Sequence, residues 1–478
     1  MKQLFTLTFF VFLLHSALFA QQFSQYNAGT LYDSFENPSQ KSFTPDSSRN
    51  VGFNLFVPNF NADLVLSGNA QELFKKRVFI GRYDESSLKL GQGNLNHLNT
   101  NINAYAFMLK LYTSLDGDKE IGFAIQTKGE GHGVFSDESA QLLGDNSTLG
   151  DDPLTGILNF NFNYQAYHQF GFTYRENLDK QFSFGIKLSA LFGIVYNKVE
   201  INHSYLNFDR ENDRAFISLA GRYHASFVPG KFEKSDVLPT TKNPGASISI
   251  GAAYISNDGI KMQWNVKDLG FIHWNQSSLA GTFNNTGVIK GLSTIQFEDN
   301  LAKTVSTVVQ SGASQQGFNS PTDGHAEFSA SKSYWLGYNS IKYTPTVILS
   351  KELFYSGVTG ALVNHFQHGN LVATVTGSYD NNQIFNLGGQ LMIKSPNAEF
   401  FIGSDRLWQT MGLARLAMNR TSSQASKNSE FSGANIYMGF SMKLGSVIEH
   451  PANASTIPMD EKRSFFKRFW QRITKKDD

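Results

Sequence analysis

Residues 160–199 alternate between apolar and polar side chains over two long stretches. In 160–175 the even positions are nearly all apolar or aromatic, and the odd positions are almost all polar or glycine. The alternation resumes in 182–197 after the polar residues 176–180. Because successive strand side chains point to opposite faces, this pattern predicts a β-hairpin with one apolar face. Its arms exceed the roughly 9 to 11 residues that a tilted membrane-spanning strand needs, which indicates a transmembrane hairpin.

Shorter alternating segments recur along the rest of the chain. Residues 51–57 and 62–67 are predicted as a first pair of strands, broken at Pro58 and Asn59. Residues 129–157 lose the period and gather Gly, Asp, Ser and Asn, which predicts a long loop that includes the glycine-rich stretch 129–133. The remaining predicted strands are 98–112, 120–128, 213–227, 247–254, 260–266, 325–338, 343–352, 357–366, 370–380, 384–394, 397–404, 409–418 and 434–444, and residues 300–310 have the period of a short helix.

These segments predict an all-β fold, a single transmembrane antiparallel β-barrel of the outer-membrane type. We expect about 14 strands, within a range of roughly 12 to 16. Barrels of this type alternate short periplasmic turns with long outer loops, so the turns at 116–118 and 176–180 are assigned to the periplasm and 129–157 to the outside. The mean hydropathy of −0.28 suits such a fold, because alternating strands average out as polar. The net charge of +1 gives no indication of nucleic-acid binding.

The two ends of the chain differ from the barrel region. Residues 1–20 have a basic start, an apolar stretch and small residues near Ala20, which predicts a cleaved signal peptide and export to the outer membrane. Residues 21–48 are polar and rich in turn residues, and they are interpreted either as a plug in the barrel mouth or as a periplasmic leader. The barrel itself is assigned to residues 49–445.

Residues 446–478 are predicted as a periplasmic linker followed by a short basic amphipathic helix. Such a helix lies on a membrane surface or docks on a partner protein, and the alternative is packing beneath the barrel mouth. The predicted partners are therefore outer-membrane lipid and, through this tail, other envelope proteins. The candidate docking residues are Phe465, Phe466, Arg468, Phe469, Trp470 and Ile473.

The sequence contains no recognisable catalytic or cofactor-binding motif. There is no Cys, the 11 His are scattered, and no nucleophile elbow, phosphate loop or dinucleotide fingerprint occurs. We therefore expect no enzymatic activity, no cofactor and no metal site. Cations on the polar faces of the strands are the candidate functional residues, because a cationic lumen favours anionic solutes. The alternative is that they pair with acids of the plug or loops and fill the interior. These candidates are Lys128, Lys187, Arg214, Arg222, His224, Lys261, Lys267 and Lys443.

Three stretches resemble an uncharacterised family of outer-membrane proteins from gliding, type IX-secreting bacteria. They are Asp268-Leu269-Gly270-Phe271-Ile272-His273-Trp274, Phe400-Phe401-Ile402-Gly403-Ser404-Asp405, and the region around Asn37-Pro38. The resemblance covers about residues 23–445. The family is in turn distantly similar to FadL-type barrels, which implies an N-terminal plug, a 14-stranded barrel and a kinked strand that opens sideways to lipid. The basic tail after residue 444 departs from that pattern.

Two functions are consistent with these observations. The first is a FadL-like passive channel or transporter for small amphipathic or hydrophobic molecules, as the plug-like segment and polar inner face indicate. The second is a non-transporting barrel subunit of a larger envelope or type IX secretion assembly, as the tail and the resemblance imply. The sequence names no substrate.

Overall fold

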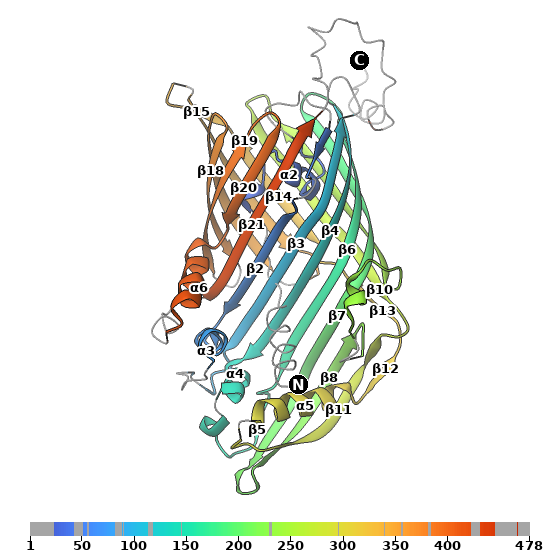
Figure 1. Ribbon diagram of the computed structural model, residues 1–478, viewed down its shortest axis with the longest axis vertical. Helices are drawn as coiled ribbons and strands as arrows, with labels where there is room; N and C mark the ends of the chain where they lie inside the picture. Colours follow the sequence, from blue (N-terminus) through green and yellow to red (C-terminus); the bar gives the residue numbers. More distant parts are fainter. Residues whose placement is uncertain are drawn as a thin grey trace, which may run out of the picture.

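The described residues form one closed antiparallel β-barrel (Figure 1). The computed structural model describes residues 23–42, 51–54, 57–81, 88, 90–112, 118–144, 146–228, 232–294, 296–338, 340–354, 357–380, 384–421, 431–444 and 466. Fourteen strand positions follow one another around the ring, and pairing of the first with the last closes it. The predicted fold class and the expected number of strands are therefore confirmed.

Each barrel strand pairs in antiparallel register with a neighbour on either side. In ring order the strands are β2 (Asn59–Ser67), β3 (Leu95–Tyr112), β4 (Lys119–Ser136), β6 (Phe160–Asn177), β7 (Phe182–Asp209), β9 (Pro244–Ile255), β10 (Ile260–Trp274), β14 (His325–Lys332), β16 (Ile341–Glu352), β17 (Val358–His368), β18 (Leu371–Asp380), β19 (Phe385–Lys394), β20 (Ala398–Ser404) and β21 (Phe431–Leu444).

The two faces of the barrel wall differ in polarity. In β19, Leu391 points outward with 60% of its surface exposed, whereas the adjacent Gln390 points inward and is 3% exposed. The hairpin predicted at 160–199 follows the same rule, with Phe172 and Leu188 outward and Lys187 buried inside. An apolar outer face and a polar interior are what a barrel in a lipid bilayer requires. The chain is accordingly an outer-membrane β-barrel.

The turns at the two ends of the barrel differ in length (Figure 1). One end carries short connections, such as the β9–β10 turn, where Gly259 adopts a φ of +77° that glycine reaches without steric cost. The other end carries the longer insertions, including helices α3 (Gln71–Ile80) and α4 (Asp137–Gly144). Because outer-membrane barrels keep short turns in the periplasm, we call these the periplasmic and extracellular ends.

The same sheet extends beyond the barrel at the extracellular end, and this extension is here called the extracellular sheet. Strand β7 continues past the barrel, where β8 (Arg214–Ala225) replaces β9 as its neighbour. Strand β8 then pairs with β11 (Leu279–Lys290), and β11 pairs with β12 (Ala313–Gln315). Helix α5 (Phe297–Gln310) packs on this sheet and confirms the helix predicted near 300–310. Their shared apolar core includes Leu206, Ile217, Leu219, Ile289, Leu301 and Val308.

Short elements complete the chain. They are β1 (Val51–Phe53), β5 (Leu154–Thr155), β13 (Phe318–Pro321), β15 (Tyr334–Leu336), α2 (Leu31–Glu36) and α6 (Leu407–Asn419). Among the described residues, no helix is long and apolar enough to cross a membrane.

Four local predictions are wrong. The segments 51–57 and 62–67 are not a pair of strands, because β1 and β2 both pair with β3 and β21 and so share one strand position. The segment 129–157 is not one long loop, since β4 runs on to Ser136, with outward glycines close to neighbouring side chains, and α4 follows directly. The segment 409–418 is helical, because its short apolar run lacks a strand partner. Strand β8, predicted at 213–227, lies outside the barrel ring.

Candidate functional site

Residues 23–42, here called the plug, lie inside the barrel towards its periplasmic end (Figure 1). The plug contains the short α-helix α2. Its N-terminal cap is Thr30, whose hydroxyl accepts a hydrogen bond from the backbone N–H of Asp33. Of the two interpretations of 21–48, the described part therefore fits the plug. The predicted signal peptide lies outside the described residues.

The plug backbone is held by charged side chains of the barrel wall. Lys394 donates from Nζ to the carbonyl oxygens of Ala28 (2.7 Å) and Gly29 (2.9 Å). Glu399 accepts a hydrogen bond from the backbone N–H of Leu31 at 2.7 Å. The Glu399 contact satisfies an N–H in the first turn of α2 that has no partner within the helix. The wall thus recognises the plug main chain by charge-assisted hydrogen bonds.

The C-terminal part of the plug packs closely against β7 and β9 because the wall residues that face it are glycines. A side chain at Gly185 would collide with the carbonyl group of Pro38, and one at Gly251 would come within 2.5 Å of the Asn37 side chain. On the same side, Arg175 donates from Nε to the carbonyl oxygen of Ser39 at 2.9 Å. Close backbone approach of this kind is available only where the wall lacks a Cβ.

The centre of the lumen holds a buried charge triad. Asp268 forms ion pairs with Lys128 and with Lys187, the latter at 3.2 Å between Nζ and Oδ1. Asp268 adopts a φ of +51° at a bulge where the β10 register shifts, so that it and the preceding Lys267 both point inward. Gln169 donates a further hydrogen bond to Asp268 at 2.9 Å.

A second ion-pair group joins the plug to the wall. Lys267 bridges Glu327 on β14 (2.9 Å) and Glu36 on α2 (3.3 Å). Glu36 also accepts hydrogen bonds from the Tyr105 hydroxyl (2.8 Å) and from Asn103 (3.1 Å). Glu36 is therefore the main electrostatic anchor between the plug helix and the barrel.

Two acids on the plug helix have opposite protonation behaviour. Burial raises the pKa of Asp33 to about 7, because the lumen desolvates its charged form more than Lys261 and the Gly29 N–H stabilise it. Burial also opposes ionisation of Glu36, but Lys267, Lys128 and Lys187 together lower its pKa to about 2. Glu36 thus anchors the plug as an anion, whereas Asp33 titrates near neutral pH.

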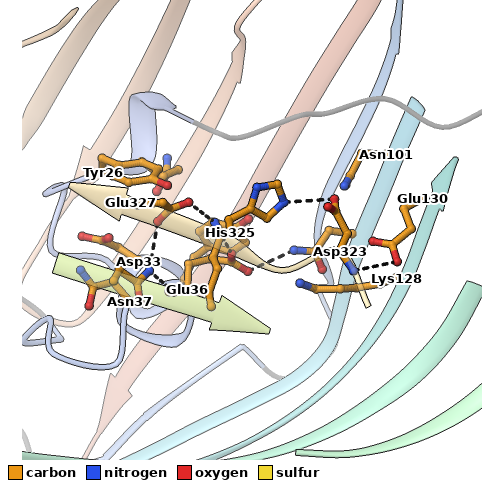
Figure 2. A pocket seen from close by; sticks show the side chains of 15 residues that line it. Tyr26, Asp33, Glu36, Asn37, Asn101, Lys128, Glu130, Asp323, His325 and Glu327 are labelled. Carbon is orange, nitrogen blue, oxygen red and sulfur yellow. Dashed lines mark hydrogen bonds and ion pairs between the residues drawn. The ribbon is translucent and has the colours of Figure 1, made fainter. Parts of the chain in front are cut away.

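Figure 2 shows the small cavity between the plug and the wall. Its volume is about 50 Å³, which holds a few water molecules and no organic solute. Glu36 and Tyr26 of the plug face Glu327, His325 and Asp323 of the wall across it. His325 pairs with Asp323 at 3.0 Å. In the described residues, no group of three or more His, Asp and Glu side chains is placed to hold a metal ion.

A wider cavity opens at the periplasmic mouth. Its volume is about 580 Å³, and it lies between the plug and the ends of the neighbouring strands. Lys261 lines it and donates from Nζ to Asn27 (2.7 Å) and Gln40 (2.6 Å) of the plug. The plug therefore separates this vestibule from the lumen on its extracellular side (Figure 1).

One position in the barrel wall is interrupted beside the plug. Phe53, the last residue of β1, pairs with Leu109 of β3, and Asn59, the first residue of β2, pairs with Tyr105. The chain therefore has five residues between the two strands where β3 has three. Asn54 fills the gap towards β3 by donating to the Tyr105 carbonyl (3.1 Å) and accepting from the Met108 N–H (2.5 Å). Asn59 accepts from the Phe440 N–H of β21 at 2.7 Å. Side chains thus replace ladder hydrogen bonds on both sides of the interruption.

The inner surface beside this interruption is apolar. Tyr32 and Phe35 of the plug pack with Tyr105 and Met108 of β3 in one buried cluster that also contains Phe401. The ring centroids of Tyr32 and Tyr105 lie 5.5 Å apart in an edge-to-face arrangement. An aromatic patch therefore lies directly behind the interrupted strand.

The predicted lumen cations fall into two groups. Lys128, Lys187, Lys261, Lys267 and Lys443 lie on the inner face of the barrel. In contrast, Arg214, Arg222 and His224 do not line the lumen, because β8 belongs to the extracellular sheet. Arg214 pairs there with Asp209 at 2.7 Å, Arg222 is exposed, and the His224 ring contacts Phe318 at 5.1 Å between centroids.

The alternative in which these cations pair with acids of the plug or loops named no partner residue, and Lys267 pairs with Glu36 of the plug. Glu36, Asp268 and Glu327 become partners only through the barrel closure and the plug. One signal was available, since the adjacent charges Lys267 and Asp268 break the alternation of β10 and mark its bulge.

Among the predicted docking residues of the tail, only Phe466 is described. Its ring lies 5.6 Å from Phe184 and 6.1 Å from Tyr174, measured between centroids, on the outward face of the β6–β7 hairpin. Phe465, Arg468, Phe469, Trp470 and Ile473 lie outside the described residues.

Comparison with solved structures finds other barrels at low sequence identity. The monoaromatic hydrocarbon channel TodX, as a ΔS2S3 variant, is 8% identical with a TM-score of 0.44, over 90% of this chain and 96% of that one. The toluene transporter TodX of P. putida is 7% identical with a TM-score of 0.40, over 90% and 95%. A FadL homologue from Pseudomonas aeruginosa is 8% identical with a TM-score of 0.37, over 88% and 94%.

Comparison with protein families is more decisive. No curated protein matches the sequence. The model of a family of unknown function, DUF5723, matches residues 42–405, which is most of the chain and includes the barrel strands from β2 to β20, the charge triad and the interrupted strand. The resemblance to an uncharacterised barrel family is therefore confirmed, and the chain belongs to the family of unknown function DUF5723.

Proposed function

We propose that this barrel is a FadL-like passive channel for small amphipathic or hydrophobic molecules. The observation that carries the proposal is the interrupted strand between β1 and β2, which meets an aromatic patch on its inner side. A solute that reaches this patch can leave sideways into the membrane without crossing the polar lumen. The wall there is held by the side chains of Asn54 and Asn59 instead of a continuous ladder.

Passage requires the plug to move. The cavity between plug and wall has a volume of about 50 Å³, too small for any organic solute. The plug is held mainly by hydrogen bonds and ion pairs, such as Lys394 to Ala28 and Glu36 to Lys267. Hydrogen bonds to charged groups contribute about 1.5–3 kcal/mol each, so a plug movement that exchanges one or two of them for water at a time costs a few kcal/mol.

The substrate class follows from the two surfaces that the solute would meet. The lumen around Asp268 and Lys267 is polar and charged, whereas the patch of Tyr32, Phe35 and Met108 is apolar. A molecule with a polar end and an apolar body satisfies both surfaces. Aromatic faces also accept flat apolar groups by stacking.

The proposal is tested by closing the interruption. A variant shortened by two residues between Asn54 and Pro58 preserves the inward and outward faces of the strand, because strand side chains alternate with a period of two. Wild-type and shortened proteins are reconstituted in vesicles, and uptake of a fluorescent amphipathic probe is measured. We expect the shortened barrel to remain folded, as judged by its migration on an unheated gel, and to lose most uptake. Unchanged uptake would overturn the proposal.

A second candidate function is a barrel subunit of an envelope assembly that transports nothing. The filled lumen favours it, as does the extracellular sheet with its own apolar core around Leu219 and Ile289. In that case neither protein takes up the probe, and the complete chain co-purifies with other envelope proteins from solubilised outer membranes.

A further inference from the structure

Helix α6 lies where a strand of the barrel wall ends early. Strand β20 stops at Ser404, and its last pairs are Gly389–Ser404 with β19 and Gly403–Tyr437 with β21. Both neighbours extend further towards the extracellular end, β19 from Phe385 and β21 from Phe431. Figure 1 shows α6 at this place, on the side of the barrel, at the extracellular ends of these strands.

Polar contacts fix α6 to both edges of the gap. The Thr410 hydroxyl accepts a hydrogen bond from the Asn435 N–H of β21 (2.9 Å) and donates to the Asn435 carbonyl (3.3 Å). Arg406, just before the helix, pairs with Asp63 of β2 at 3.0 Å and donates to Asn386 of β19. The helix therefore completes the wall by satisfying edge groups that the missing strand would otherwise pair.

The outward face of α6 is apolar and basic. Trp408, Met411 and Met418 are 65%, 42% and 75% exposed. Arg415 lies on the same face, seven residues after Trp408, at the spacing of two helical turns. Arg420 follows at the C-terminal cap, and residues 407–421 contain no Asp or Glu.

This face continues the lipid-facing band of the barrel. Exposed apolar side chains surround it on the neighbouring strands, including Tyr379, Phe385, Ile402 and Ile436. A contiguous apolar surface of this kind is normally covered by a membrane or a partner. Because α6 adjoins the membrane-facing wall, lipid is the occupant that the surface fits. The arginines add a preference, since guanidinium groups bind phosphate through paired hydrogen bonds.

We propose that α6 is a docking site for a phosphate-bearing anionic lipid of the surrounding membrane. The acyl chain lies along Trp408, Met411 and Met418, and the phosphate is bound between Arg415 and Arg420. This site is separate from the interrupted strand, so the proposed lipid binding does not depend on the proposed transport.

Trp408 provides the reporter for the test. The full-length protein is placed in nanodiscs of phosphatidylcholine that contain a fixed fraction of a brominated lipid, either phosphatidylglycerol or phosphatidylcholine. Bromine quenches nearby indoles, and the difference between wild type and Trp408→Phe isolates the contribution of Trp408. We expect brominated phosphatidylglycerol to quench Trp408 more strongly, because each arginine enriches anionic lipid locally about fivefold.

Arginine substitutions distinguish a specific binding site for anionic lipid from non-specific contact between α6 and the bilayer. Arg415→Gln with Arg420→Gln is expected to abolish the preference for phosphatidylglycerol, whereas the exposed control Arg222→Gln on the extracellular sheet keeps it. All variants are first checked for folded-barrel migration on unheated gels. Equal quenching by the two lipids in the wild type would overturn the proposal. Absence of any Trp408 quenching, with the protein dimeric, would instead assign this face to a second copy and also overturn it.

Discussion

Asp268→Asn is expected to be among the most destabilising isosteric changes in this chain. The carboxylate is 1% exposed and is the counter-ion of both Lys128 and Lys187, which are 14% and 2% exposed at their side chains. The substitution keeps the shape and the hydrogen bond from Gln169 but removes the charge. Removing one partner of a buried ion pair costs about 3–5 kcal/mol, because the remaining charge stays desolvated. We therefore predict a loss of about 3–5 kcal/mol in the free energy of unfolding.

The measurement is urea unfolding of the barrel refolded into detergent micelles. Folded and unfolded barrels migrate differently on unheated gels, which gives the folded fraction at each urea concentration. A triple variant, Asp268→Asn with Lys128→Met and Lys187→Met, removes the unpaired charges and is expected to recover most of the loss. The control is Glu200→Gln, whose partner Lys198 is 3.5 Å away in a partly exposed pair, with an expected cost of about 0.2–1 kcal/mol. A loss below about 1 kcal/mol for Asp268→Asn would refute the assignment of Asp268 as the electrostatic centre of the lumen.

Three further predictions concern the plug and the interruption. Asn54→Ala and Asn59→Ala each leave backbone groups unpaired and should lower stability by about 1–3 kcal/mol in the same urea assay, with values near zero excluding a capping role. Gly185→Ala should displace the plug through the collision with Pro38, so a spin label on Lys41→Cys should become more mobile while the barrel stays folded; unchanged mobility would contradict the close fit. Because the docked plug raises the pKa of Asp33 to about 7 above an ordinary value near 3.8, docking is strongest below that ordinary value and weakens as pH rises through about 7. Spin-label mobility should therefore increase between about pH 5 and 8, and Asp33→Asn should reduce the dependence.

The barrel could be predicted from the sequence because its wall is repetitive. Each strand carries the same alternation of apolar and polar residues. Phe172, Leu188 and Leu391 lie on the outer face of the barrel, as this pattern predicts. The alternation does not reveal which strand partners another, so β8 was predicted as a strand but not placed in the extracellular sheet. The same limit explains why β1 and β2 were predicted as a pair of neighbouring strands. An interrupted strand and a short hairpin have the same local pattern of apolar and polar residues.

The charge network depended on contacts that no local pattern encodes. Glu36 and Lys267 are far apart in the chain and meet only because the plug enters the closed barrel. Helix α6 was missed for a different reason. Its run of Leu, Met and Ala is short, and apolar segments of this length fit a strand or a helix until their neighbours are known.

Solutes are expected to pass only when the plug moves, and a reversible covalent link between plug and wall tests this most directly. The chain has no Cys, so Ser24→Cys with Thr376→Cys introduces a single possible disulfide where the two hydroxyl oxygens lie 2.9 Å apart. Uptake of the amphipathic probe into vesicles is measured for the oxidised and the reduced protein, with each single-cysteine variant as control. We predict that oxidation stops uptake and that reduction restores it. Uptake by the oxidised protein at the wild-type rate would contradict the account.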